Sequence, residues 1–188
     1  MTCGNKKIED VVLIYNIKLG ETMPNWCENK LTIEGNVESL IKFKEQAKSK
    51  EKGIDTDIRM NNFVPMPKEL INTISPWEHP NWYDWALENW GTKWDITAYL
   101  VSEIDDELIY EFDSAWNPPI KWLENVGPMF PELTFELEYK ESGMCFQGFM
   151  MAKGNFFISQ DQEHYEDRID YDVRHQQAME DLENMRFF

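Results

Sequence analysis

The sequence has few of the residues on which disulfide scaffolds, metal sites and membrane spans depend. Its three cysteines, Cys3, Cys27 and Cys145, are odd in number and show no paired spacing. This argues against a disulfide framework or a structural zinc site and suits a reducing compartment. No apolar run approaches the roughly 20 residues that a membrane-spanning helix requires. We therefore expect a cytoplasmic protein that does not associate with a membrane.

The residues that usually carry catalysis are also scarce. The three histidines, His79, His164 and His175, lie at no metal-binding spacing from one another or from a cysteine. Ser114 and Cys145 have no evident base partner, and a phosphate-binding glycine loop is absent. These absences predict no metal and no cofactor, and they favour a protein that is not an enzyme.

Basic residues are few compared with acidic ones. Lys and Arg together number 18 against 35 Asp and Glu, which gives a formal net charge of −17. Direct binding to nucleic acid is not expected, because a phosphate backbone attracts clustered Lys and Arg. The excess of carboxylates has two interpretations: it keeps the protein in solution, or it forms an acidic surface that imitates a polyanion.

Hydrophobic periodicity predicts a first strand and two helices. Leu31 and Ile33 alternate with charged or polar neighbours, as in a half-buried strand, and Gly35 ends the pattern. Asn36 is suited to cap a helix that reaches to about residue 50. A second helix is predicted over residues 81–89, with Gly91 as its stop.

The later part of the chain predicts mainly strands. Residues 94–100 and 107–112 alternate and are joined by a turn at Asp105-Asp106, which is typical of an antiparallel hairpin. Asn117 followed by two prolines predicts the start of a short helix. Strands are then predicted over 133–139, 144–152 and 156–158. The order of elements predicts an α+β, ferredoxin-like split βαβ fold, with a mostly antiparallel sheet and helices on one face.

Composition divides the chain into three parts. Residues 1–22 differ from the rest, and we expect translation to begin at Met23; the alternative is an N-terminal strand at 11–15. Residues 23–159 form the ferredoxin-like domain, with an irregular, proline-containing insert at 53–80. Residues 160–188 are acidic and contain neither Gly nor Pro, which predicts a partly helical C-terminal segment.

Several motifs resemble a single family. They are MPNWCENKLTIEG at Met23–Gly35, FVPMPKEL at Phe63–Leu70, NWYDWALENWGTKWD at Asn81–Asp95 and FDSAWNPP at Phe112–Pro119. The group they resemble is the phage- and plasmid-borne one with a YubB-type ferredoxin-like domain, and the resemblance spans about residues 23–150. It implies a ferredoxin-like fold and a mobile-element origin, hence a bacterial host cell. It implies no activity, because a fold alone does not specify one.

Four of the eight tryptophans lie within residues 81–95. Such a cluster has two interpretations: a recognition pocket in which indole rings stack on bases or sugars, or a dense part of the core. The candidate binding residues are Asn81, Trp82, Trp85, Asn89, Trp90, Thr92, Lys93, Trp94, Asp95, Trp116 and Asn117.

These observations leave three hypotheses for function. The first is a non-enzymatic binding protein of a phage or mobile element that acts on a host protein or other macromolecule, as an acidic DNA mimic or anti-defence factor. The second is a nucleic-acid or small-ligand module that uses the Trp and Asn cluster. The third is an enzyme built around Asp95 and Asp113. The sequence does not specify the partner or the oligomeric state.

Overall fold

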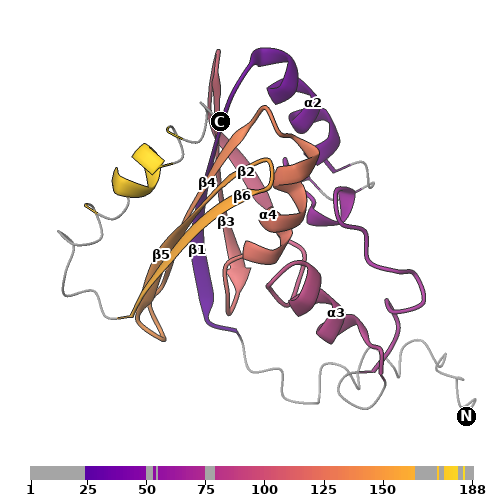
Figure 1. The fold of residues 1–188 in the computed structure, drawn as a ribbon. Coiled ribbons are helices and arrows are strands. Elements are labelled where there is room, and N and C mark those ends of the chain that lie inside the picture. The colour runs from indigo at the N-terminus through magenta and orange to yellow at the C-terminus, as the bar shows by residue number, and fades with distance from the viewer. Residues whose placement is uncertain are drawn as a thin grey trace, which may run out of the picture.

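A computed structural model of the chain describes residues 24–49, 53, 55–74 and 79–163, together with 173, 176–181 and 184. The predictions for residues 1–22 and for a start at Met23 lie outside this part of the chain. The described strands form one antiparallel sheet in the order β2-β3-β1-β4-β5-β6 (Figure 1). The first strand, β1 (Trp26–Glu34), lies between β3 (Glu107–Ala115) and β4 (Thr134–Glu141).

The remaining strands complete two hairpins. Strand β2 (Ala98–Ile104) pairs with β3 across the predicted turn at 105–106. Strands β5 (Phe146–Lys153) and β6 (Phe156–Glu163) extend the sheet beyond β4. The first four strands, with one helix after β1 and one after β3, have the βαββαβ order of a ferredoxin-like unit. The predicted fold class is confirmed, and β6 continues past the boundary that composition suggested at residue 159.

The first helix, α2 (Val37–Ala47), begins where the sequence predicts. The Oδ1 atom of Asn36 accepts a hydrogen bond from the backbone N–H of Ser39 at 2.9 Å, which satisfies one of the free donors of the first turn. Gly35 precedes it, and a Cβ at that position would lie 2.6 Å from Cδ2 of Leu133. Only glycine therefore allows the chain to leave β1 so close to the start of β4.

The insert contributes a 3₁₀ turn, η1 (Met60–Asn62), and the helix α3 (Trp82–Asn89) follows it. Helix α4 (Ile120–Val126) is followed by a second 3₁₀ turn, η2 (Gly127–Met129). The predicted cap of α4 is wrong: Pro119 occupies the N-cap position, and Asn117 lies outside the helix. A residue before a proline is driven out of the helical region, so Pro118 cannot be the first residue of the helix.

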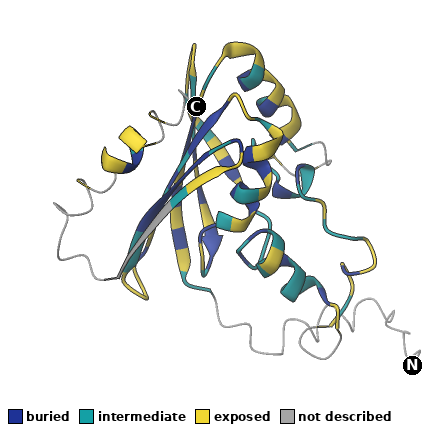
Figure 2. Cartoon of the chain, in the orientation of Figure 1, coloured by how far each residue is buried: buried dark blue, intermediate teal, exposed yellow. Residues whose placement is uncertain are grey.

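The core lies between the sheet and the helices α2, α3 and α4, which cover one face (Figures 1 and 2). Phe43 of α2 is fully buried at its centre, with its ring centroid 5.1 Å from that of Phe63 and 5.7 Å from that of Phe135. Trp122 of α4 packs its ring edge-on against Phe63 at 5.6 Å. Phenylalanine rings thus share the centre of the core with the indole of Trp122, which the sequence did not single out.

The opposite side of the sheet, here called the open face, has two different halves. On β5 its residues Phe149 and Met151 are buried together with Ala178 of the C-terminal segment. That segment is helical at residues 176–181 and lies on the side away from α2 and α4 (Figure 1). The prediction of helices on one face therefore holds for α2, α3 and α4, while the C-terminal helical residues cover an apolar strip on the other.

The predicted strand over 94–100 starts too early, because β2 begins only at Ala98. Asp95 accepts hydrogen bonds from the backbone N–H groups of Met60 at 2.8 Å and Asn61 at 3.3 Å. These bonds tie the segment to η1 and hold it outside the sheet ladder. The alternation of apolar residues at 94, 96, 98 and 100 therefore extends beyond the strand itself.

Candidate functional site

The amide side chains of the predicted cluster are occupied within α3. Asn81 is fully buried, and its Oδ1 accepts hydrogen bonds from the backbone N–H groups of Tyr83 and Asp84, each at 3.0 Å. Asn89 donates from Nδ2 to the backbone carbonyl of Trp85 at 2.9 Å. These two residues cap and brace the helix rather than face a ligand.

Several of the cluster's remaining members pack into the core. Trp90 is 4% exposed, and its indole N–H donates to the carbonyl of Val64 at 2.9 Å. Trp85 packs edge-on against Trp90 with a centroid separation of 5.2 Å. Thr92 is fully buried and donates from Oγ1 to the carbonyl of Ala115 at 2.9 Å. These three residues therefore belong to the core and not to a recognition pocket.

The other predicted residues of the cluster lie at its margins. Trp82 is half-buried and meets the ring of Tyr83 edge-on at 5.7 Å. Trp116 is half-buried in a left-handed conformation with φ of 71°, and its N–H donates to the carbonyl of Asn25 at 2.9 Å. Asn117 is exposed and accepts at its backbone carbonyl from Ser114. The structure does not bring these three side chains together into one site.

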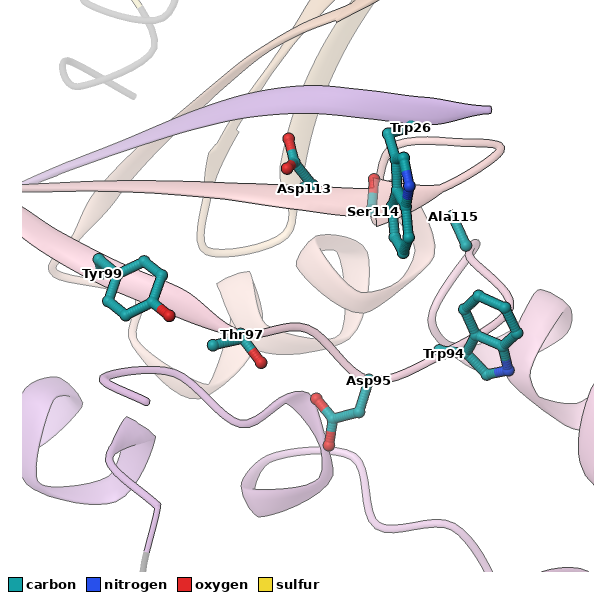
Figure 3. Close-up of a pocket in the computed structure, with 8 residues that line it drawn as sticks. All are labelled: Trp26, Trp94, Asp95, Thr97, Tyr99, Asp113, Ser114 and Ala115. Carbon is teal, nitrogen blue, oxygen red and sulfur yellow. The ribbon is translucent and has the colours of Figure 1, made fainter. Parts of the chain in front are cut away.

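Two of the predicted residues, Trp94 and Asp95, line a pocket of about 290 Å³ at one end of the open face. We call it the Trp26 pocket; its walls come from β1, β2, β3 and the segment before β2 (Figure 3). The lining residues are Trp26, Trp94, Asp95, Thr97, Tyr99, Asp113, Ser114 and Ala115. A third predicted residue, Lys93, adjoins the pocket, with Nζ 4.2 Å from the ring centroid of Trp94.

The rings of the Trp26 pocket are far more exposed than those of the core. The Trp26 side chain is 50% exposed and that of Tyr99 is 59% exposed. The rings of Trp26 and Trp94 are 6.2 Å apart between centroids and tilted by 44°. In Figure 3 the ring of Trp26 and the ring of Tyr99 lie on different sides of the pocket. Large aromatic surface left in water beside polar groups is typical of a recognition site.

The two carboxyl groups of the Trp26 pocket have different surroundings. Asp95 accepts from three backbone N–H groups and lies 3.4 Å from Nε of Arg59. Burial raises the pKa of Asp95, although Arg59 and these N–H groups oppose the rise. Asp113 is exposed on β3, and burial of part of the group together with the charge of Glu28 raises its pKa. Asp95 thus fixes the backbone, while Asp113 is left exposed on the strand.

The two carboxyl groups lie on opposite sides of the pocket (Figure 3). They are therefore not aimed at a common reacting atom, as a general acid and base would be. Among the described residues, no group of three or more His, Cys, Asp or Glu side chains is placed to hold a metal ion. Within the same part of the chain, no helix combines the length and apolar character needed to cross a bilayer.

Negative charge dominates the open face of the three central strands β3, β1 and β4. The pairing register and the alternation of side chains place seven carboxylates there against Lys30 and Lys140. The carboxylates are Glu28, Glu34, Glu107, Glu111, Asp113, Glu136 and Glu138. We call this surface the acidic face, and exposed and buried residues alternate along its strands (Figure 2).

The acidic face contains two pairs of like charges directly opposite each other on β1 and β3. Glu28 lies opposite Asp113 near the Trp26 pocket, and Glu34 lies opposite Glu107 at the other end. Between them Lys30 lies opposite Glu111 and forms an ion pair with Glu138 at 2.9 Å. Like charges directly opposite destabilise a sheet, so both ends of this strand pair carry a stability penalty.

Sequence reasoning missed Trp26 and Tyr99 as members of the site. A signal for both exists in the alternation of the strands, because Trp26 has the same parity as Glu28 and Lys30, and Tyr99 lies between the inward Ala98 and Leu100. Alternation alone does not show that the two rings line one pocket. Their positions around one pocket depend on the registers of β1 and β2 against β3, and the first of these joins residues 73 to 89 positions apart.

The comparisons with known proteins concern the fold and the family. The crystal structure of protein api92 from Yersinia pseudotuberculosis is similar to this chain with a TM-score of 0.51 and 10% sequence identity, covering 75% of this chain and 98% of that one. At that identity the likeness shows the fold alone. A comparison with curated proteins gives no match.

A family model described as "Ferredoxin-like domain in Api92-like protein" matches residues 89–185. The match covers more than half of the chain and includes most of the acidic C-terminal segment, which the sequence resemblance had left outside. It also includes β2, β3 and Asp113 of the Trp26 pocket. The chain therefore belongs to the family of Api92-like proteins with a ferredoxin-like domain.

Proposed function

We propose that the chain is a non-enzymatic binding protein whose acidic face occupies a basic, DNA-binding surface of a host protein. The observation that carries the proposal is the excess of seven carboxylates over two lysines on the exposed side of β3, β1 and β4. Such a surface attracts clustered Lys and Arg and speeds their association. In this proposal the protein acts in the bacterial cytoplasm as a mimic of DNA. It would then be an anti-defence factor or a regulator of a DNA-binding enzyme.

The arrangement of these charges supports a role in binding. Alternate residues of one strand are about 6.6–6.8 Å apart along the backbone, and adjacent strands are about 4.8 Å apart, so carboxylates on three neighbouring strands are closely spaced in two dimensions. Two of its cross-strand pairs, Glu28 with Asp113 and Glu34 with Glu107, repel each other within the folded protein. A basic partner would relieve this repulsion on binding. Departures from a stable arrangement are expected where a surface serves a function.

A mobile-element origin, which the sequence resemblance implies, would support the same proposal. The motifs at Met23–Gly35 and Asn81–Asp95 resemble the phage- and plasmid-borne group with a YubB-type domain. A protein from such an element must act on components that the host supplies. Host nucleases and other DNA-binding proteins carry the basic surfaces that an acidic face would fit.

A displacement experiment tests the proposal. Proteins from a bacterial lysate are bound to DNA-cellulose, and the purified chain is added at low salt. We expect it to release a defined subset of the bound proteins, and we expect release to decline as salt rises, because screening weakens the attraction. The released proteins are then identified by mass spectrometry.

Two matched triple variants show whether the acidic face is responsible. The first neutralises three of its carboxylates: Glu28→Gln, Glu111→Gln and Asp113→Asn. The second removes the same charge from exposed positions outside the sheet: Glu45→Gln, Glu69→Gln and Glu88→Gln. Only the first should lose the ability to release proteins. Equal loss in both variants, or no release by the unaltered chain, contradicts the proposal.

Direct binding to single-stranded nucleic acid is the alternative that the exposed rings of Trp26 and Tyr99 favour, because bases stack on such rings. The surrounding charges oppose it: Glu111 lies opposite Tyr99, and Asp113 lines the same pocket. These carboxylates would repel a phosphate backbone that approached the rings. We therefore expect no retention of single-stranded DNA or RNA in a filter-binding assay at low salt.

A further inference from the structure

The Trp26 pocket combines aromatic faces with a carboxylate at the edge of the acidic face. Trp26 and Trp94 provide two tilted rings, Tyr99 provides a third, and Asp113 lies on the strand between Trp26 and Tyr99. Trp26 and Tyr99 are half or more exposed, although both are large enough to gain from burial. The pocket therefore offers surface that a ligand would cover.

The electrostatics of these groups favour a positively charged ligand. The face of an indole ring attracts cations, and tryptophan does so more strongly than tyrosine or phenylalanine. The chain already shows this contact, since Nζ of Lys93 lies 4.2 Å from the centroid of the Trp94 ring. Asp113 adds a negative charge, and Glu28 opposite it adds another. A cation would relieve the repulsion between these two carboxylates.

We propose that the Trp26 pocket binds an arginine guanidinium group of a basic partner protein, with its plane against the indole rings and its N–H groups donating to Asp113. The proposal deepens the proposed function and rests on it for the source of the arginine. The pocket would then select arginine at one end of the acidic face, whereas the rest of that face attracts any basic group.

The geometry distinguishes a guanidinium from other cations. A guanidinium is planar, stacks on aromatic rings and donates two parallel hydrogen bonds to one carboxylate, whereas an ammonium is compact and strongly hydrated. The pocket provides a pair of rings and the carboxylate of Asp113. Asp95, by contrast, already accepts hydrogen bonds from the backbone. Its volume of about 290 Å³ is ample for the end of one side chain.

Three short peptides test the proposal on the purified full chain. They are acetyl-Gly-X-Gly-amide with arginine, lysine or citrulline at X, where citrulline keeps the planar shape and loses the charge. Binding is followed through the indole N–H signals in ¹H–¹⁵N spectra, assigned by substituting Trp26 and Trp94 one at a time with phenylalanine. We expect the arginine peptide to shift both signals and to bind at least about fivefold more tightly than the lysine peptide, with citrulline weakest.

Substitutions then locate the site. Asp113→Asn and Tyr99→Ala should each weaken arginine-peptide binding by about tenfold, because they remove the charge-assisted hydrogen bonds or one aromatic wall. Glu107→Gln is the matched control, since it removes one carboxylate from the like-charge pair at the other end of the same strands. It should change binding by less than about twofold. Amide spectra of each variant verify that the fold is intact.

The possible outcomes separate this proposal from the function on which it rests. No shift of the Trp26 and Trp94 signals, equal binding of arginine and lysine peptides, or equal weakening by Asp113→Asn and Glu107→Gln would each overturn the guanidinium site. If the DNA-cellulose experiment nevertheless succeeds, the acidic face acts through charge alone. If arginine binds the pocket and no protein is released from DNA, the site stands and the polyanion function fails.

Discussion

Trp90 and Trp26 place the same side chain in two opposite environments. Trp90 is 4% exposed, donates its indole N–H to the carbonyl of Val64 and packs against Trp85. Trp26 is 50% exposed, lies at the start of β1 and meets the tilted ring of Trp94 across the pocket. The first ring has its polar and apolar requirements met within the fold. The second ring leaves half of its surface exposed to water.

The same contrast extends to the carboxylates near each ring. Asp95 is directed at the backbone of η1 and stabilises the local fold, whereas Asp113 faces Glu28 and weakens the strand pair on which it lies. Groups that stabilise the fold and groups that oppose it thus lie within a single pocket. This difference gives a practical rule for separating structural from binding residues in this chain: measure what each side chain contributes to stability.

The largest effect is expected from Trp90→Ala. This change removes a buried ring from between α3 and the insert and leaves the carbonyl of Val64 without its donor. Large-to-small changes of buried aromatic residues lower the free energy of unfolding by about 3–5 kcal/mol. Urea denaturation followed by circular dichroism measures the loss. A loss below about 1 kcal/mol would show that Trp90 is not a core residue and would remove the contrast with Trp26.

Local patterns in the sequence predicted most of the helices and strands and their antiparallel arrangement. Alternation around Leu31 and Ile33 predicted β1, and the capping residue Asn36 predicted the start of α2. The turn at Asp105-Asp106 predicted the β2–β3 hairpin. Each of these signals lies within a few residues of the element that it specifies, because hydrogen bonding of caps and turns is local.

The site was less predictable because it depends on contacts between distant segments. The sequence grouped Trp94 with Trp82, Trp85 and Trp90 since they are neighbours along the chain. The fold separates them: Gly91 ends α3 with φ of 85°, and the next residues run to β2 on the other side of the core. Trp94 then meets Trp26, and nothing in the local pattern of either segment specifies that pairing.

The second-largest effect is expected from Asp95→Ala. The substitution leaves the backbone N–H groups of Met60 and Asn61 without their acceptor and removes the partner of Arg59. Loss of hydrogen bonds to a charged group at this partly buried position should lower the free energy of unfolding by about 2–3 kcal/mol. Thermal denaturation measures it. If stability is unchanged while arginine-peptide binding is lost, Asp95 would be a binding residue and not a structural one.

Trp26→Ala should lower stability less than Trp90→Ala does, and it should reduce the fraction of tryptophan fluorescence that acrylamide can quench. Because half of the Trp26 side chain is already exposed, the loss of apolar burial should amount to about 1 kcal/mol, well below the loss for Trp90→Ala. Acrylamide quenching of tryptophan fluorescence provides an independent measure. The quenchable fraction should fall in Trp26→Ala and should not fall in Trp90→Ala if that variant remains folded. The reverse order would contradict the assignment of the two rings.

The smallest effect is expected from Asp113→Asn, and it is a gain in stability. The charge of Asp113 opposes that of Glu28 directly across the strand pair, so its removal should stabilise the protein by a few tenths of a kcal/mol at neutral pH. Glu107→Gln should give a comparable gain at the other end, because it relieves the pair with Glu34. If Asp113→Asn destabilises the protein as Asp95→Ala does, the two carboxylates do not differ in role.

The pH dependence of that gain identifies Asp113 as its source. Burial and Glu28 raise the pKa of Asp113 in the folded protein, so the folded state holds this proton more firmly than the unfolded chain does. The penalty from Asp113 therefore develops as pH rises from the ordinary range of an aspartate through the raised pKa, and it is fully present above it. The stability difference between Asp113→Asn and the unaltered chain should accordingly be greatest at neutral pH and should disappear in acid, where both states are protonated. A difference that stays constant across this range would mean that the gain comes from packing and not from relief of charge repulsion on the acidic face.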